Sequence, residues 1–101
     1  ISETHVLLGE IYLQRMQIKL AEFHLKRAVE IKPDYALSMR NLGIIYYFHL
    51  KKPKEAAVYF SRALSIDPNQ KEADNIRILI KKIRKQICKL NRIFDSIIIC
   101  I

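Results

Sequence analysis

The chain has no tryptophan and contains only two glycines, three prolines and two cysteines among its 101 residues. Because so few residues break helices, the composition predicts a strongly helical protein. Two cysteines without a spacing pattern form neither a disulfide framework nor a metal site, so a reducing, cytoplasmic setting is expected. Half of the residues are hydrophobic, which argues against disorder and allows one small domain with a packed core.

Acidic residues are also scarce, and the net charge is +8. Residues 1–70 carry ten Lys or Arg and seven Asp or Glu, whereas residues 71–101 carry eight and three. The basic excess therefore belongs mainly to the last segment of the chain. There is no signal peptide, and the chain starts at Ile1 inside a repeat pattern, so we expect a fragment of a longer array.

Both glycines lie in matching contexts, "LLGEIYL" and "NLGIIYY", which indicates an internal repeat. The pairs Gly9/Gly43 and Tyr12/Tyr46 are 34 residues apart, and the pairs Ala21/Ala56, Ala28/Ala63 and Pro33/Pro68 are 35 apart. One extra residue must lie between Tyr46 and Ala56, where we expect the turn at Pro53 to absorb it. Apolar spacing predicts two helices per unit, over 3–16, 19–32, 35–49 and 54–67.

This pattern resembles the tetratricopeptide repeat (TPR) family. The family has Leu-Gly-x-x-Tyr in its first helix, Ala-x-x-x-aromatic-x-x-Ala in its second, and a closing proline. The first unit has Leu8-Gly9-Tyr12 and Ala21-Leu25-Ala28-Pro33 at these positions. The second unit has Leu42-Gly43-Tyr46 and Ala56-Phe60-Ala63-Pro68. Leu25 and His5 depart from the family pattern. The resemblance implies an all-α, right-handed α-solenoid of two antiparallel helix hairpins, repeat 1 over 2–35 and repeat 2 over 36–70. A long amphipathic capping helix over 71–94 and a hydrophobic tail over 95–101 complete the expected single domain.

The resemblance also implies a concave groove that binds a partner peptide and is lined by the first helix of each unit. By position, this groove contains Glu3, Val6, Leu7, Glu10, Leu13, Leu37, Arg40, Asn41, Ile44, Tyr47, Asn75, Ile76 and Leu79. Asn41 is the most informative of them, because its family counterpart often hydrogen-bonds a peptide backbone. The packing residues of the repeat are expected to be structural, and Gly43 should allow two helices to approach closely.

The segment 71–94 departs from the repeat, and its helix is expected to start with an Asn69 cap and a reciprocal Glu72. Three roles are open for it: a cap on the repeats, self-association, or contact with an anionic membrane surface. Nucleic acid is the least favoured partner, because no aromatic residues lie among the lysines. Self-association would use the apolar seam, of which Ile83, Ile87, Leu90 and Phe94 form the distal half.

The sequence contains no recognisable catalytic or metal-binding pattern. The three histidines stand singly in the sequence, and no nucleophile-base arrangement or phosphate loop is present. We therefore expect no enzyme, no cofactor and no metal, but a scaffold that binds a protein or peptide. Two alternatives remain open at this stage: a non-catalytic recognition arm of a larger enzyme or secretion component, and a self-association module formed by the last helix.

Overall fold

The computed structural model of the protein describes residues 1–69 and 72–93. The regular secondary structure of this part of the chain is entirely helical, without a strand, which confirms the predicted all-α class. Its elements are α1 (Ser2–Gln14), α2 (Ile18–Ile31), α3 (Ala36–Ile44), the π-helical segment η1 (Ile45–His49), α4 (Pro53–Ile66) and α5 (Ala73–Ile93).

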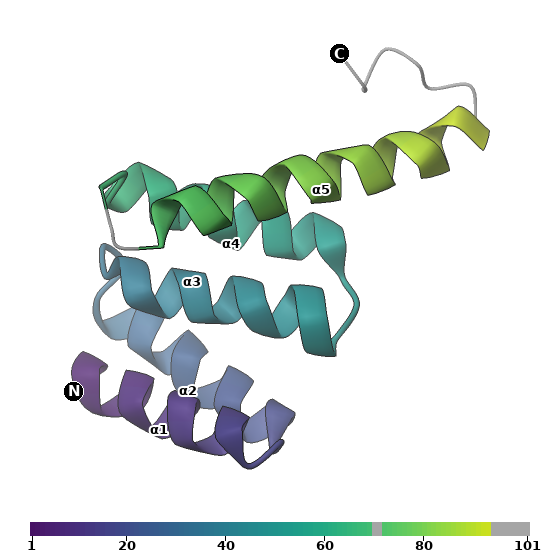
Figure 1. The fold of residues 1–101 in the computed structure, drawn as a ribbon. Helices are drawn as coiled ribbons and strands as arrows, with labels where there is room; N and C mark the ends of the chain where they lie inside the picture. The colour runs from purple at the N-terminus through teal and green to yellow at the C-terminus, as the bar shows by residue number, and fades with distance from the viewer. Residues whose placement is uncertain (70–71, 94–101) are drawn as a thin grey trace.

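The helices form two hairpins that stack in chain order, with α5 lying across the end of the stack (Figure 1). In each hairpin the two helices pack against each other, α1 on α2 and α3 on α4, and the hairpins meet where α2 contacts α3. Helices α1, α3 and α5 share one side of the stack, and α2 and α4 lie behind them (Figure 1). This arrangement places the first helix of each unit on a common face.

The two glycines lie at the closest contacts between the helices of each hairpin. A Cβ atom on Gly9 would approach Cγ of Leu25 to 2.7 Å, and one on Gly43 would approach two ring carbons of Phe60 to 2.7 Å. Both facing side chains are fully buried. The expected close approach at Gly43 is therefore confirmed, and Leu25 occupies in unit one the place that Phe60 occupies in unit two.

The extra residue of unit two lies within a helix, so the prediction that the turn absorbs it was wrong. The turns 15–17 and 50–52 have equal length, and each has one left-handed residue, Met16 at φ 60° and Lys51 at φ 57°. Before the second turn, the N–H of Leu50 donates to Ile45 O at 2.9 Å, five residues back. This wide π-helical turn holds one residue more than the matching part of α1.

The same adjustment preserves the bond that closes each hairpin. In unit one, the N–H of Gln17 donates to Tyr12 O at 2.8 Å, and in unit two the N–H of Lys52 donates to Tyr46 O at 2.7 Å. The two tyrosines are 34 positions apart and the two donors 35. The π-helical turn therefore keeps Tyr46 directed into the core while the turn retains its shape.

The last helix begins later than predicted and uses a different contact at its start. Glu72 immediately precedes α5, so it is not placed to act as the third-residue partner of an Asn69 cap. Its carboxylate lies 3.7 Å from Nη1 of Arg40 instead. Pro53, in contrast, is the first residue of α4, where a missing N–H is harmless as predicted.

The described part of the apolar seam of α5 packs against the repeats. Ile76 and Ile83 are 2% and 0% exposed, and Ile87 packs against the same core cluster. Ile83 is thus unavailable to a second chain in this fold. The side chain of Leu90, all of Phe94 and the tail 95–101 lie outside the described residues.

Candidate functional site

The face shared by α1, α3 and α5, here called the front face, is joined by polar contacts between neighbouring helices. Nδ2 of Asn41 donates to Oε1 of Glu10 at 3.2 Å and links α3 to α1. Nε2 of Gln86 donates to the hydroxyl of Tyr47 at 3.4 Å and links α5 to η1. Of these contacts, only that between Asn41 and Glu10 joins two predicted groove residues; the others join Tyr47 to Gln86 and Arg40 to Glu72.

Most residues predicted to line the groove are at least partly accessible. Glu3, Leu7 and Asn75 are exposed, and the half-buried members are Glu10, Leu13, Leu37, Arg40, Ile44, Tyr47 and Leu79. Leu7 is the most open apolar side chain among them, at 60% exposure. The front face therefore combines apolar contact area with accessible charged and polar groups.

Three of the predicted lining residues are deeply buried. Val6 is 2% exposed and belongs to the hydrophobic core, as does Ile76, so neither presents its side chain to a ligand. Asn41 is 4% exposed, and its amide already donates to Glu10. A peptide that binds Asn41 through this donor must compete with the Glu10 carboxylate.

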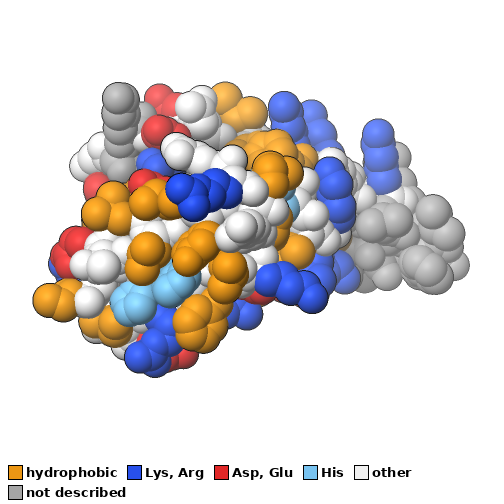
Figure 2. Space-filling model, turned by 90° about the horizontal axis from the view of Figure 1, so that it is seen from below, with side chains coloured by type: hydrophobic (Ala, Val, Ile, Leu, Met, Phe, Trp, Pro, Cys, Tyr) orange, Lys and Arg blue, Asp and Glu red, His pale blue; other side chains and the backbone are white. Residues whose placement is uncertain are grey.

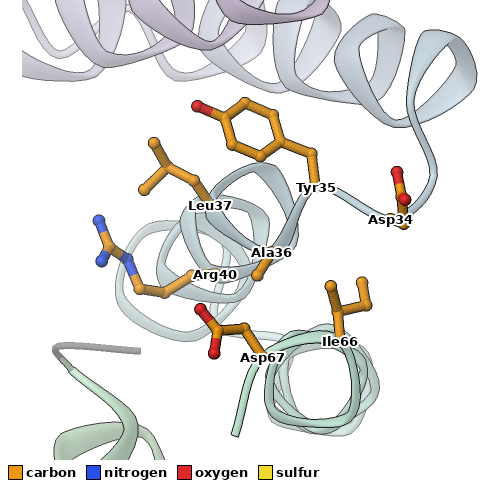
Figure 3. A pocket seen from close by; sticks show the side chains of 7 residues that line it. All are labelled: Asp34, Tyr35, Ala36, Leu37, Arg40, Ile66 and Asp67. Carbon is orange, nitrogen blue, oxygen red and sulfur yellow. The ribbon is translucent and has the colours of Figure 1, made fainter. Parts of the chain in front are cut away.

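A cavity of about 430 Å³ opens beside Arg40, where the turn between α2 and α3 meets the end of α4 (Figure 3). It is lined by Asp34, Tyr35, Ala36, Leu37, Arg40, Ile66 and Asp67. The Nε atom of Arg40 is buried without a hydrogen-bond partner in the described part of the chain. The guanidinium group of Arg40, two carboxylates and an aromatic ring thus line one cavity.

Sequence reasoning found only two residues of this cavity, Leu37 and Arg40. A signal for the others exists, because Asp34 follows Pro33 and Asp67 precedes Pro68 in the equivalent turns that close the two units. Equivalent turns of stacked hairpins lie at the same end of the stack. The repeat register thus predicts that these two carboxylates lie at the same end of the stack.

A smaller cavity of about 230 Å³ lies beside η1, near the turn that joins it to α4. Tyr47, Phe48, Lys51, Pro53 and Gln86 line it. The Phe48 ring is half exposed and contacts the Tyr47 ring edge-on, with 4.8 Å between the ring centroids. Sequence reasoning missed Phe48 and Gln86, although Gln86 is two helical turns after Leu79 on the same side of α5.

A charged group holds the two units together behind this face. The Tyr46 hydroxyl donates to the carboxylate of Glu22, and Nζ of Lys26 lies 3.3 Å from the same carboxylate. The hydrogen bond with Tyr46, followed by that with Glu22, raises the pKa of Lys26 to about 12. Burial would raise the pKa of Glu22, but its hydrogen bonds from Tyr46 and Lys26 outweigh burial and lower it. The group stabilises the α2–η1 contact.

Two of the three histidines pair, which the sequence did not indicate because they lie on different helices. The Nδ1 atoms of His5 and His24 are 3.2 Å apart, and the Tyr12 ring stacks on His24 with 5.4 Å between centroids. Figure 2 shows this pair among hydrophobic side chains on the surface of the first hairpin. Burial, the charge of the N-terminus, His24 and Arg27 lower the pKa of His5 from 6.5.

The His5 pair predicts a pH-dependent stability. Because the pKa of His5 is lower in the folded state than in the unfolded state, the unfolded chain binds the proton more readily below about pH 6.5. Stability is therefore lost as the pH falls through 6.5 towards the folded pKa. We expect the melting temperature to drop between about pH 7.5 and about pH 5.5, and His5→Gln to reduce that drop. Thermal scans by circular dichroism measure both.

His49 provides the matched control, because it is the one histidine outside the pair. His49→Gln should leave the pH dependence as in the wild-type chain. An equal reduction by both substitutions would show that the histidine count, rather than the contact between His5 and His24, sets the acid sensitivity.

Stacked helix hairpins with a shared face of first helices define an all-α helical-repeat protein. The family model for the tetratricopeptide repeat matches residues 2–35 and 41–70, which is more than half of the chain. The chain therefore belongs to the tetratricopeptide repeat family, as the sequence motifs predict.

A relative from Pyropia yezoensis, described as "Uncharacterized protein ycf37", is 29% identical over 82 residues. The match covers 81% of this chain and 46% of the relative, so the chain spans about half the length of that protein.

Within residues 1–69 and 72–93, no helix combines the length and apolarity needed to cross a bilayer. The same part of the chain contains no group of three or more His, Cys, Asp or Glu placed to hold a metal ion.

Proposed function

We propose that the chain is a protein–protein interaction module that binds an extended or helical peptide segment of a partner on its front face. The observation that carries this proposal is the alignment of α1, α3 and α5 on one side (Figure 1), together with the bonds from Asn41 to Glu10 and from Gln86 to Tyr47 between these elements. A surface built from three helices offers several anchoring points along one bound segment.

The chemistry of the front face indicates the kind of segment. Tyr35 and Leu37 supply apolar contact beside Arg40, and Tyr47 and Phe48 do so beside Gln86. A peptide with two apolar anchors, one of them next to an acidic or amide group, complements both cavities. The two carboxylates near Arg40 disfavour a segment of high negative charge.

The finer architecture is part of the same proposal. We infer a right-handed solenoid in which α5 serves as the cap of the second unit, and the burial of Ile76 and Ile83 supports that role. A capping helix leaves its own front side, including Leu79 and Asn75, as the third wall of the groove.

The proposal is tested with a peptide selected from a displayed random-peptide library. Its affinity is then measured by fluorescence anisotropy for the wild-type chain and for Arg40→Gln, Asn41→Ala and Tyr47→Ala. We expect each substitution to weaken binding, and Tyr47→Ala to do so about tenfold, since half-buried aromatic anchors dominate such interfaces. Melting temperatures of the variants check that they remain folded.

Arg62→Gln provides the control, because Arg62 is exposed on α4, behind the front face. It removes the same charge as Arg40→Gln and should leave the affinity unchanged. If selected peptides lose affinity with Arg62→Gln but not with the three front-face variants, binding occurs on the other side and the proposal fails.

A further inference from the structure

The outward side of α5 is a strongly basic surface that the proposed peptide groove does not use. Helix α5 contains a single carboxylate, that of Asp74, and its cationic residues are Arg77, Lys81, Lys82, Arg84, Lys85, Lys89 and Arg92. Its apolar seam packs inward on the core, so the side turned away from the repeats carries the charge. Ile78 is 53% exposed on that same side.

A cavity of about 350 Å³ lies at the edge of this surface, between α4 and α5. It is lined by Ser61, Leu64, Arg77, Ile80, Lys81 and Arg84. Spacings of four and three residues place the three cations on one side of the helix. The residues that line it in the described part of the chain include no carboxylate.

The cations differ in how firmly they are held. Arg77 is fixed by Asp74, with 3.0 Å between Nη1 and Oδ1, and by a bond of 3.0 Å from Nη2 to Pro68 O. Neither Lys81 nor Arg84 forms an ion pair with another residue in the described ranges. These two side chains can therefore turn to an incoming anion without breaking an existing pair.

We propose that this cavity binds the phosphate group of an anionic lipid headgroup, and that the outward side of α5 lies against a membrane surface. Lys81 and Arg84 contact the phosphate, and the Ser61 hydroxyl supplies a further donor. Leu64 and Ile80 accept the apolar carbons that follow the headgroup. A free anion would leave these apolar groups unmatched, and this favours a lipid as the source of the phosphate.

The remaining charges strengthen this choice of occupant. Lys82, Lys85 and Lys89 continue the basic surface beyond the cavity, and juxtaposed basic residues attract an anionic leaflet over a distance of about 10 Å. Because α5 closes one end of the stack, a membrane on its outward side leaves the front face open (Figure 1). Peptide binding and membrane contact are therefore compatible, and this inference does not depend on the groove.

Vesicle co-sedimentation of the full chain tests the proposal. Vesicles of phosphatidylcholine alone are compared with vesicles that also contain phosphatidylglycerol. We expect binding only to the anionic vesicles, and a decrease as salt is added. Lys81→Gln/Arg84→Gln should weaken this binding about tenfold, because it removes the two free cations of the cavity.

Lys82→Gln/Lys85→Gln is the matched control, since it removes two charges from the same helix outside the cavity. It should weaken binding less than the cavity variant does, because it reduces only the general attraction. Equal losses in the two double variants would overturn the cavity as a site. Absence of binding to anionic vesicles would overturn the membrane contact. Inorganic phosphate or an oligonucleotide that displaces the chain from vesicles at equimolar concentration would overturn the lipid as its ligand.

Discussion

Gly43→Leu is expected to lower the free energy of unfolding by about 3 kcal/mol, because the contact it disturbs has no spare volume. A Cβ atom alone would lie 2.7 Å from two carbons of the Phe60 ring, which is fully buried. The buried ring must therefore shift, or α3 and α4 must separate, to relieve the overlap. The helix propensity of leucine exceeds that of glycine by less than about 1 kcal/mol and does not offset the overlap. Urea unfolding followed by circular dichroism measures the loss.

Two variants make this test specific. Ser65→Leu adds the same side chain at an exposed position of α4 and should change stability by less than about 0.5 kcal/mol. Gly43→Leu combined with Phe60→Ala should be less destabilised than the sum of the single variants, since the smaller residue makes room for leucine. Additive losses, or an unchanged melting temperature for Gly43→Leu, would contradict the packing role of the glycine.

The role of the glycines was predictable because its signal is local and repeated. Each glycine directly follows a leucine and lies three residues before a tyrosine. Gly9 and Gly43 therefore indicate the same packing requirement in both units. The location of the extra residue had no such signal. A turn or a helix can absorb one residue, and the choice depends on keeping both Tyr46 and the Lys51 turn in place. Tertiary contacts decide that choice, and no local pattern reports it.

In the candidate site, too, some features could be predicted from the sequence and others could not. Position in the repeat family places Arg40, Leu7 and Tyr47 in the groove, and all three are at least partly accessible. It does not separate Val6, which is buried, from Leu7, which is exposed, because adjacent helical positions differ by about 100° and the rotation of α1 is set by its packing on α2. Contacts between helices, such as that of Gln86 with Tyr47, depend on the relative shift of α5 and η1. The sequence contains no direct record of that shift.

Ile83→Ala is the second substitution with a large expected effect. Ile83 is fully buried in the cluster that also contains Phe60 and Ile76, so truncation leaves a cavity between α5 and the repeats. We expect a loss of about 3 kcal/mol in the free energy of unfolding, within the range measured for buried isoleucine. The loss should appear as a lower urea midpoint of one cooperative transition. That result requires α5 to fold together with the hairpins.

Ile78→Ala removes the same atoms from the exposed side of α5 and should be nearly neutral. The dependence of the melting temperature on protein concentration then distinguishes packing within one chain from self-association. If Ile83 stabilised the chain by contacting a second copy, the melting temperature of the wild-type chain would rise with protein concentration. Ile83→Ala would then abolish that rise. Because Ile83 is enclosed by its own chain, we expect the same difference between wild type and Ile83→Ala at every concentration. A difference that disappears on dilution would contradict the role of α5 as part of the core.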